Sequence, residues 1–190
     1  DNNDQPLSIT TQLTLHNGVK MPLFGLGTYK TLHRLDNVIK CAWDNGITHL
    51  DTAAFYENEQ EIGDAIKRLN LPRDQLFITT KMWYTEHGYN TAIKAFETSL
   101  KKLGTDYVDL YLVHWPGTID DGPDNPKIRR DTWRAFEDLY KQGKCRAIGV
   151  SNYTVKHLQE MIEDGPYKVE IIPMVNQFEL HPRLTQKELV

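Results

Sequence analysis

The sequence predicts an α/β fold in which parallel strands and helices alternate and close into a (β/α)₈ barrel, the TIM barrel. Three observations predict it: short apolar runs recur along the chain, segments of helical period separate them, and polar residues stand at the ends of successive runs. The runs are rich in β-branched and aromatic residues, which favours strands. The predicted strands are residues 23–28, 49–52, 76–81, 108–114, 146–152 and 174–180.

A small β-hairpin is expected before the first of these strands. Residues 9–15 and 19–23 flank His16-Asn17-Gly18, and Asn-Gly is a favoured turn in hairpins. We therefore predict that the segment 8–22 caps the barrel and is not one of the barrel strands.

The segments between the strands have the apolar spacing of amphipathic helices. Apolar residues recur at intervals of three and four, and Gly46, Gly104 and Gly143 end three of the segments, as glycine commonly does. Nearly continuous apolar strands, each followed by one such helix, imply a parallel sheet covered by helices. The apolar stripes of the predicted helices span residues 35–43, 62–69, 93–103, 133–139 and 155–162.

One irregular stretch interrupts this alternation. Residues 116–127 are rich in Pro, Gly and Asp and follow the fourth predicted strand. Loops of this length in compact domains are usually functional or mobile, so a role in substrate specificity is expected here.

Polar residues at strand ends favour a barrel over a doubly wound sheet. An unpaired polar side chain is costly to bury, and in a (β/α)₈ barrel the carboxyl ends of all strands meet on one face, where the active site lies. Some of these residues could instead be helix caps or loop residues. The residues concerned are Asp51, Lys81, His114, Ser151 with Asn152, and Gln177.

A candidate proton donor follows the second strand. Tyr56 lies five residues beyond Asp51, and a loop tyrosine alone is more often a packing residue. Together with Asp51, Lys81 and His114 it forms a plausible four-residue site. A phenol has a pKa of about 10, and a nearby ammonium favours its ionised form, so Lys81 is expected to lower the pKa of Tyr56.

Composition limits the classes of function. The 190 residues are 39% hydrophobic and 25% charged, which is typical of one globular domain spanning residues 1–190. With a net charge of -4 and no run of Lys or Arg longer than two, nucleic acid is not an expected partner, and a small molecule is. No apolar run approaches the roughly 18 residues of a membrane span, so neither membrane insertion nor a signal peptide is expected. Cys41 and Cys145 form no CxxC pair and are interpreted as core residues of a cytoplasmic protein.

Two other kinds of site are weakly supported. Gly25 and Gly27 lack the third glycine of a dinucleotide fingerprint. His49 and Asp51 alternate on one strand, but no HEXXH motif or histidine cluster accompanies them. We therefore expect no metal site and interpret His49 as a buried, hydrogen-bonded side chain.

The sequence resembles the aldo-keto reductases along essentially its whole length. By this resemblance the catalytic tetrad is Asp51, Tyr56, Lys81 and His114. The motifs that carry the resemblance are GVKMPLFGLGTYK (18–30), GITHLDTAAFYENEQEIG (46–63), LFITTKMW (76–83), LGTDYVDLYLVHWP (103–116), AIGVSN (147–152) and PMVNQFELHP (173–182).

The resemblance implies an NADP(H)-dependent reductase of aldehydes or ketones. Nicotinamide would deliver a hydride to the carbonyl carbon, Tyr56 would protonate the oxygen as general acid, and His114 would orient the carbonyl. Many relatives carry Trp in place of Tyr29, so this pocket wall departs from the family pattern. The implied cofactor-binding residues are Thr28, Asp51, Ser151, Asn152 and Gln177, and the implied pocket walls are Tyr29, Trp83 and Trp115.

The resemblance also predicts an incomplete barrel. About six of eight β/α units are visible, and Thr185 to Glu188 read as a capping box that opens a further helix. We therefore expect this chain alone to bind NADPH weakly. The alternative to an enzyme is a truncated, non-catalytic relative with a structural or regulatory role, and the intact tetrad favours the enzyme. The substrate and the oligomeric state remain open.

Overall fold

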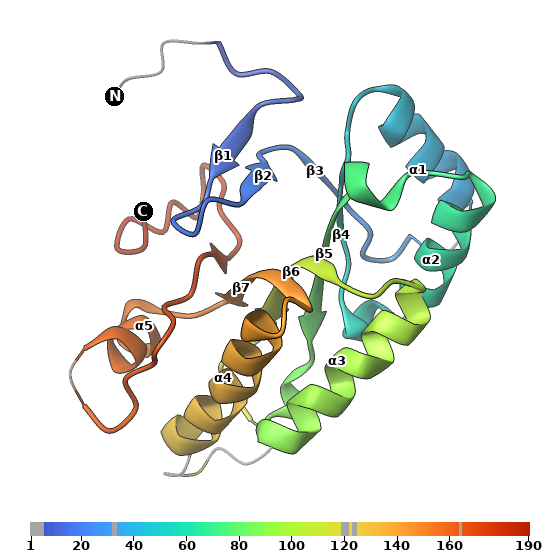
Figure 1. Ribbon diagram of the computed structural model, residues 1–190. Coiled ribbons are helices and arrows are strands. Elements are labelled where there is room, and N and C mark those ends of the chain that lie inside the picture. The colour runs from blue at the N-terminus through green and yellow to red at the C-terminus, as the bar shows by residue number, and fades with distance from the viewer. Residues whose placement is uncertain (1–5, 32–33, 119–121, 123–124, 164) are drawn as a thin grey trace.

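A parallel sheet forms the centre of the computed structural model, which describes residues 6–31, 34–118, 122, 125–163 and 165–190. Six strands lie in the order in which they follow along the chain, and each pairs in parallel with the one before it. A doubly wound sheet reverses its order at a switch point, and this sheet does not. The predicted barrel class is therefore confirmed, as a curved part of a (β/α)₈ barrel (Figure 1). The strands are β3 (Gly25–Gly27), β4 (His49–Asp51), β5 (Phe77–Met82), β6 (Val108–Val113), β7 (Cys145–Ser151) and β8 (Asn176–Gln177).

Helices cover the outer face of the sheet. Figure 1 shows α1 to α4 following one another along this side. A Cβ on Gly63 would lie 2.6 Å from the carbonyl oxygen of Leu103, so only glycine lets α2 approach the end of α3 this closely. The helices are α1 (Leu35–Asp44), α2 (Glu59–Arg68), α3 (Tyr89–Leu103), α4 (Asn125–Lys141) and α5 (Val155–Ile162), and the short 3₁₀ helices are η1 (Ala54–Tyr56), η2 (Arg73–Gln75) and η3 (Tyr84–Glu86).

The core has two layers because both faces of the central strands are covered. Between sheet and helices, Tyr111 stacks on Phe136 with ring centroids 4.6 Å apart. Inside the curve of the sheet, a second cluster includes Leu110 and Leu112 of β6 together with Leu15 from the N-terminal hairpin. This double burial explains why β5 and β6 are buried along their full length.

The predicted hairpin forms before β3. Strands β1 (Gln12–Thr14) and β2 (Lys20–Pro22) pair antiparallel around a loop in which Gly18 has a φ of 87°. The side chain of Asn17 accepts a hydrogen bond from the Val19 amide at 3.2 Å and donates one to the Arg146 carbonyl at 3.0 Å. Asn17 therefore both shapes the turn and ties the hairpin to β7.

The structure corrects several details of the predicted elements. Strand β8 has two residues where residues 174–180 were predicted, because the ladder with β7 ends at Gln177. The predicted helix from Thr185 is a turn at 187–189. Helix α4 begins at Asn125, which shortens the predicted loop of residues 116–127, and residues 119–121 and 123–124 lie outside the described part. Cys41 is exposed, contrary to the core position predicted for it, because it lies on the outer side of α1, whereas Cys145 is buried.

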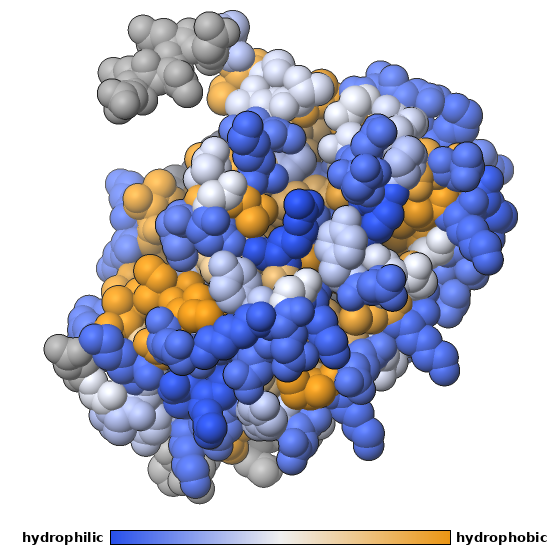
Figure 2. Space-filling model, viewed as in Figure 1, coloured by the Kyte–Doolittle hydropathy of each residue, from blue (hydrophilic) through white to orange (hydrophobic). Residues whose placement is uncertain are grey.

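The face shown in Figure 2 is mostly hydrophilic, with hydrophobic side chains in separate areas. Within the described residues, no helix is both long and apolar enough to cross a membrane.

Candidate active site

A buried ion pair occupies the carboxyl ends of β4 and β5. The Nζ atom of Lys81 lies 2.5 Å from Oδ1 of Asp51 and donates a second hydrogen bond to the Thr52 carbonyl at 2.9 Å. The Lys81 side chain is fully buried and that of Asp51 is 16% exposed. Burial lowers the pKa of Lys81, and the Asp51 carboxylate opposes this shift. The polar residues at the ends of these two strands are therefore in direct contact.

Tyr56 completes this group from the loop after β4. It ends the 3₁₀ helix η1, which turns the chain back over the strand end, and its hydroxyl lies 3.3 Å from Lys81 Nζ. Burial, helped by the negative charge of Asp51 and by Tyr29, raises the pKa of Tyr56 to about 12. This is opposite to the predicted lowering by Lys81. The reason is that the charge of Lys81 is balanced by Asp51, so the phenol experiences mainly the loss of water. Tyr56 therefore holds its proton throughout the neutral pH range.

His114 borders the tyrosine at the end of β6. Its ring centroid lies 5.7 Å from that of Tyr56 and 5.1 Å from that of Trp83, both in edge-on contacts. Burial and then the charge of Lys81 lower the pKa of His114 to about 4, although Asp51 opposes the shift. Its Nδ1 atom is buried and has no partner within the described residues. The imidazole is therefore neutral near pH 7, with hydrogen-bonding capacity that the protein does not use.

Polar residues of β7 and β8 extend the site from the other side. Gln177 donates a hydrogen bond from Nε2 to Asp51 Oδ2 at 2.8 Å, which joins β8 to the ion pair. Asn152 has a φ of 61° and donates from Nδ2 to the His114 carbonyl at 3.0 Å. Ser151 donates to the Gln177 carbonyl at 2.8 Å. All three predicted residues therefore lie at the same end of the sheet as the tetrad.

Thr28 joins the site from β3. Its amide and its hydroxyl both donate to the Asp51 carbonyl, at 3.0 and 2.9 Å. Each of the other residues predicted to bind the cofactor is thus hydrogen-bonded either to Asp51 or to Gln177, which itself bonds Asp51.

The three aromatic residues predicted to line the substrate pocket have different surroundings. The Tyr29 ring lies 4.9 Å from that of Tyr56, and the Trp83 ring borders His114. Trp115 is 45% exposed, and within the described residues its ring stacks on no other. Sequence reasoning missed Phe55, which stacks on Trp83 at 3.9 Å and adds a further wall. The signal was an aromatic residue directly before Tyr56 in the same loop.

The residues present fit a nicotinamide amide group. Within the described residues, the side-chain amide oxygens of Asn152 and Gln177 accept no hydrogen bond, although the NH₂ groups of both residues are used. The two free oxygens suit the NH₂ of a carboxamide, and so does the Ser151 oxygen, whose own proton goes to the Gln177 carbonyl. The second proton of Gln177 Nε2, which has no acceptor within the described residues, suits the carbonyl of the carboxamide. These three residues could therefore hold the reacting end of such a cofactor.

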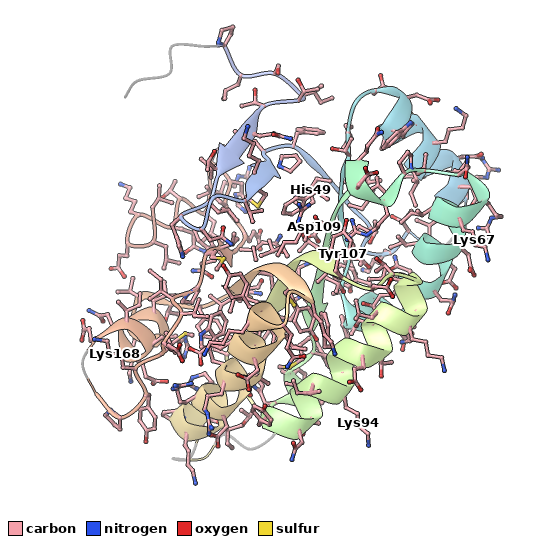
Figure 3. All side chains as sticks on the ribbon, in the orientation of Figure 1. His49, Lys67, Lys94, Tyr107, Asp109 and Lys168 are labelled. Carbon is pink, nitrogen blue, oxygen red and sulfur yellow. The ribbon has the colours of Figure 1, made fainter. Side chains whose placement is uncertain are left out.

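The base of the sheet carries a different polar group. His49 is buried and bonds Pro22 O at 3.2 Å and Thr79 Oγ1 at 2.8 Å, as predicted for a hydrogen-bonded core histidine. Figure 3 labels His49 with Asp109 and Tyr107, at the end of the sheet nearest the hairpin. No group of three or more His, Cys, Asp or Glu side chains among the described residues could hold a metal ion.

Comparison with known proteins gives a consistent result. Over 186 residues the chain is 52% identical to the glyoxal reductase of Bacillus subtilis, covering 97% of this chain and 63% of the relative, which is less than two thirds of its length. The crystal structure of an aldo/keto reductase from Brucella melitensis superposes with a TM-score of 0.84 at 39% identity, covering 95% of this chain and 66% of that one. A Bombyx mori aldo-keto reductase in complex with NADP superposes at 0.81 with 34% identity, covering 97% and 62%. Residues 21–190 match the profile of the Aldo/keto reductase family, and the chain therefore belongs to this family.

Proposed function

We propose that the protein is an NADP(H)-dependent oxidoreductase that reduces aldehydes or ketones to alcohols, with Tyr56 as general acid. The observation that carries this proposal is the contact of the Tyr56 hydroxyl with Lys81 Nζ at 3.3 Å, beside the buried Asp51 carboxylate. A protonated phenol next to a fixed positive charge is suited to release its proton only when negative charge develops nearby.

The residues divide the reaction between them. The nicotinamide, when bound, supplies the hydride that reduces the carbonyl carbon, and we assign its amide group to Ser151, Asn152 and Gln177. As the carbonyl oxygen gains charge, Tyr56 donates its proton to it. Lys81 then stabilises the phenolate, and Asp51 holds Lys81 in place. One hydride and one proton are added, so the product is an alcohol.

His114 is assigned to the orientation of the carbonyl. Because its pKa is lowered to about 4, it meets the substrate as a neutral ring and not as a cation. A neutral imidazole can donate one hydrogen bond to an oxygen without competing with Tyr56 as the acid. Tyr29, Phe55 and Trp83 would enclose the rest of the substrate.

Small aldehydes are the substrate class that we favour. The similarity to a glyoxal reductase supports it. The same similarity supports NADP(H), because related aldo-keto reductases were solved with NADPH or NADP. The alternative, a non-catalytic relative, has less support because all four tetrad side chains are present and in contact.

The test is the Tyr56→Phe variant, with NADPH oxidation followed in the presence of glyoxal. Loss of the acid should lower turnover by about 10² to 10⁴, while cofactor affinity, followed by fluorescence titration, stays close to that of the unsubstituted protein. Tyr107→Phe, which removes a phenol at the base of the sheet, is the matched control. If Tyr56→Phe keeps more than half of the turnover, Tyr56 is not the general acid.

A further inference from the structure

Asn58 is a fully buried polar residue beside the tetrad that neither the reaction nor the helix start accounts for. It occupies the N-cap position of α2 and is 0% exposed. An asparagine at this position usually caps the helix with its side chain, but here the side chain makes no such bond. Its Oδ1 instead accepts from the Thr52 hydroxyl at 2.8 Å, and its Nδ2 donates to the Thr28 carbonyl at 2.8 Å.

The first of these bonds acts on the surroundings of Lys81. Thr52 directly follows Asp51, and its carbonyl accepts from Lys81 Nζ at 2.9 Å. Its amide donates to the Thr79 carbonyl at 2.9 Å. With its hydroxyl on Asn58 as well, Thr52 is fixed at three points, and the acceptor it presents to Lys81 cannot rotate away.

The second bond acts on the surroundings of Tyr56. Thr28 is fixed through its amide and hydroxyl to the Asp51 carbonyl, and its own carbonyl accepts from Asn58 Nδ2 at 2.8 Å and from the Thr31 amide at 3.1 Å. Tyr29 follows directly, and its ring packs on Tyr56 at 4.9 Å. Asn58 therefore lies behind both groups that border the proton donor, Lys81 on one side and Tyr29 on the other.

We propose that Asn58 is a positioning residue that closes the loop of residues 52–58 on itself and on β3, and thereby holds the Tyr56 hydroxyl against Lys81 Nζ. The inference rests on the proposed function and adds to it the residue that keeps the Tyr56 hydroxyl in position to donate its proton. Without the Asn58 side-chain amide, the Thr52 hydroxyl loses its buried acceptor and the Thr28 carbonyl keeps only the Thr31 amide, so the loop moves to find new partners. A shift of about 1 Å at a reacting group can cost on the order of 100-fold in rate.

Four variants test the inference. Asn58→Ala removes both bonds, Thr52→Val removes one, and Thr52→Ser restores the hydroxyl. Thr80→Val is the matched control, because Thr80 is equally buried and bonds Glu59 at 2.6 Å, and as the neighbour of Lys81 in β5 it points to the opposite face of the sheet. Two properties are measured: turnover of glyoxal with NADPH, and the resonance of Tyr56 in protein isotopically labelled at tyrosine Cζ, assigned by its absence in Tyr56→Phe. The resonance reports the contact with Lys81 without any turnover.

We expect the Tyr56 resonance to shift in Asn58→Ala and Thr52→Val and to return in Thr52→Ser. Turnover should fall roughly 10- to 100-fold in the first two variants with little change in the KM for glyoxal, and recover in the third. If the resonance shifts but even the unsubstituted protein reduces no carbonyl, the positioning role stands and the proposed function fails. If Asn58→Ala leaves the resonance in place, or affects it and turnover no more than Thr80→Val does, the positioning role is wrong.

Discussion

At the base of the sheet, the buried carboxylate of Asp109 forms ion pairs with Arg73 at 2.8 Å and Arg146 at 3.2 Å and accepts a hydrogen bond from the Ile78 amide at 2.9 Å. The opposite end of the sheet, which carries the tetrad, is the mouth of the barrel. There Lys81 has one carboxylate, one carbonyl and one phenol around it, and the nearby Nδ1 of His114 has no partner within the described residues.

The two ends therefore use similar charged groups to different effect. At the base, two cations and an amide surround one anion, and the Arg73 guanidinium also packs 3.9 Å from the Tyr107 ring. Both carboxylate oxygens of Asp109 therefore have partners. At the mouth, the ion pair adjoins His114, whose Nδ1 has no partner within the described residues, and the pKa values of both Tyr56 and His114 are shifted. A hydrogen-bond network in which every group has a partner stabilises the fold, whereas unpaired groups remain available to bind a substrate or cofactor. This agrees with the usual division of barrel enzymes into a stabilising face and a catalytic face.

The largest expected effect follows from removing the cation at the mouth. Lys81→Met should lower carbonyl turnover by about 10² to 10⁴, because the Tyr56 phenolate loses its stabilising charge. Arg73→Met removes a cation at the base and should leave turnover unchanged. Steady-state kinetics of both variants tests this expected difference between the mouth and the base. Comparable losses of turnover in Lys81→Met and Arg73→Met would contradict it.

Removing the anion at the base should lower the stability of the protein. Asp109→Ala leaves the Ile78 amide without its acceptor and separates two arginines from their partner, which should lower the free energy of unfolding by about 2 to 4 kcal/mol. Urea unfolding measures this loss, and Asp36→Ala, which removes an exposed ion pair, is the control with little expected change. An unchanged free energy of unfolding in Asp109→Ala would mean that the interactions of Asp109 contribute little to the stability of the fold.

The pH dependence of stability should reveal the histidine at the mouth. His114 has a pKa of about 4 in the folded protein, against an ordinary value of 6.5, so the unfolded chain binds more protons between these values. Stability is therefore complete above pH 6.5 and falls as the pH falls toward 4, on the order of 2 kcal/mol by pH 5.

The variant His114→Gln should flatten this slope. His49→Gln is the counterpart at the base, where hydrogen bonding to Pro22 partly opposes the lowering of the histidine pKa by burial. We expect His49→Gln to flatten the slope less. Thermal unfolding at several pH values compares them, and a larger change in His49→Gln would reverse the comparison.

The smallest effect concerns the amides at the mouth. Asn152→Ala and Gln177→Ala should each weaken NADPH binding by about 1 kcal/mol, close to fivefold, because each removes a hydrogen bond to the cofactor. Fluorescence titration measures the affinity. The control is Asn45→Ala, which removes a bond from Asn45 to the Cys41 carbonyl at the end of α1. Unchanged affinity in both mouth variants would exclude these amides from the cofactor site.

Most of the framework could be predicted from the sequence because it depends on local patterns. Helices α1 and α3 show apolar spacing and terminal glycines, and the polar strand ends that came together at Asp51 and Lys81 are visible as interruptions of apolar runs.

What could not be predicted depends on contacts between distant residues. The direction of the Tyr56 pKa shift is set by burial and by the balance between Lys81 and Asp51, which no single residue shows. The role of Asn58 was hidden because an asparagine before a helix is read as a cap, and only the structure shows its side chain turned toward Thr28. The exposure of Cys41 likewise depends on which side of α1 faces the sheet.

The attachment of the hairpin has a consequence for the order of folding. Asn17 bonds the backbone of Arg146, 129 positions later in the chain, and Leu15 packs with residues of β5, β6 and β7. The hairpin can form early because its own turn is local, but the surface on which it docks is incomplete until β7 is in place. Loop closure over so long a segment is entropically costly and slow compared with the pairing of successive strands. During synthesis, the hairpin emerges before every strand of the sheet, yet it would be among the last of these elements to reach its final position, and its apolar residues would stay exposed to solvent until β7 follows.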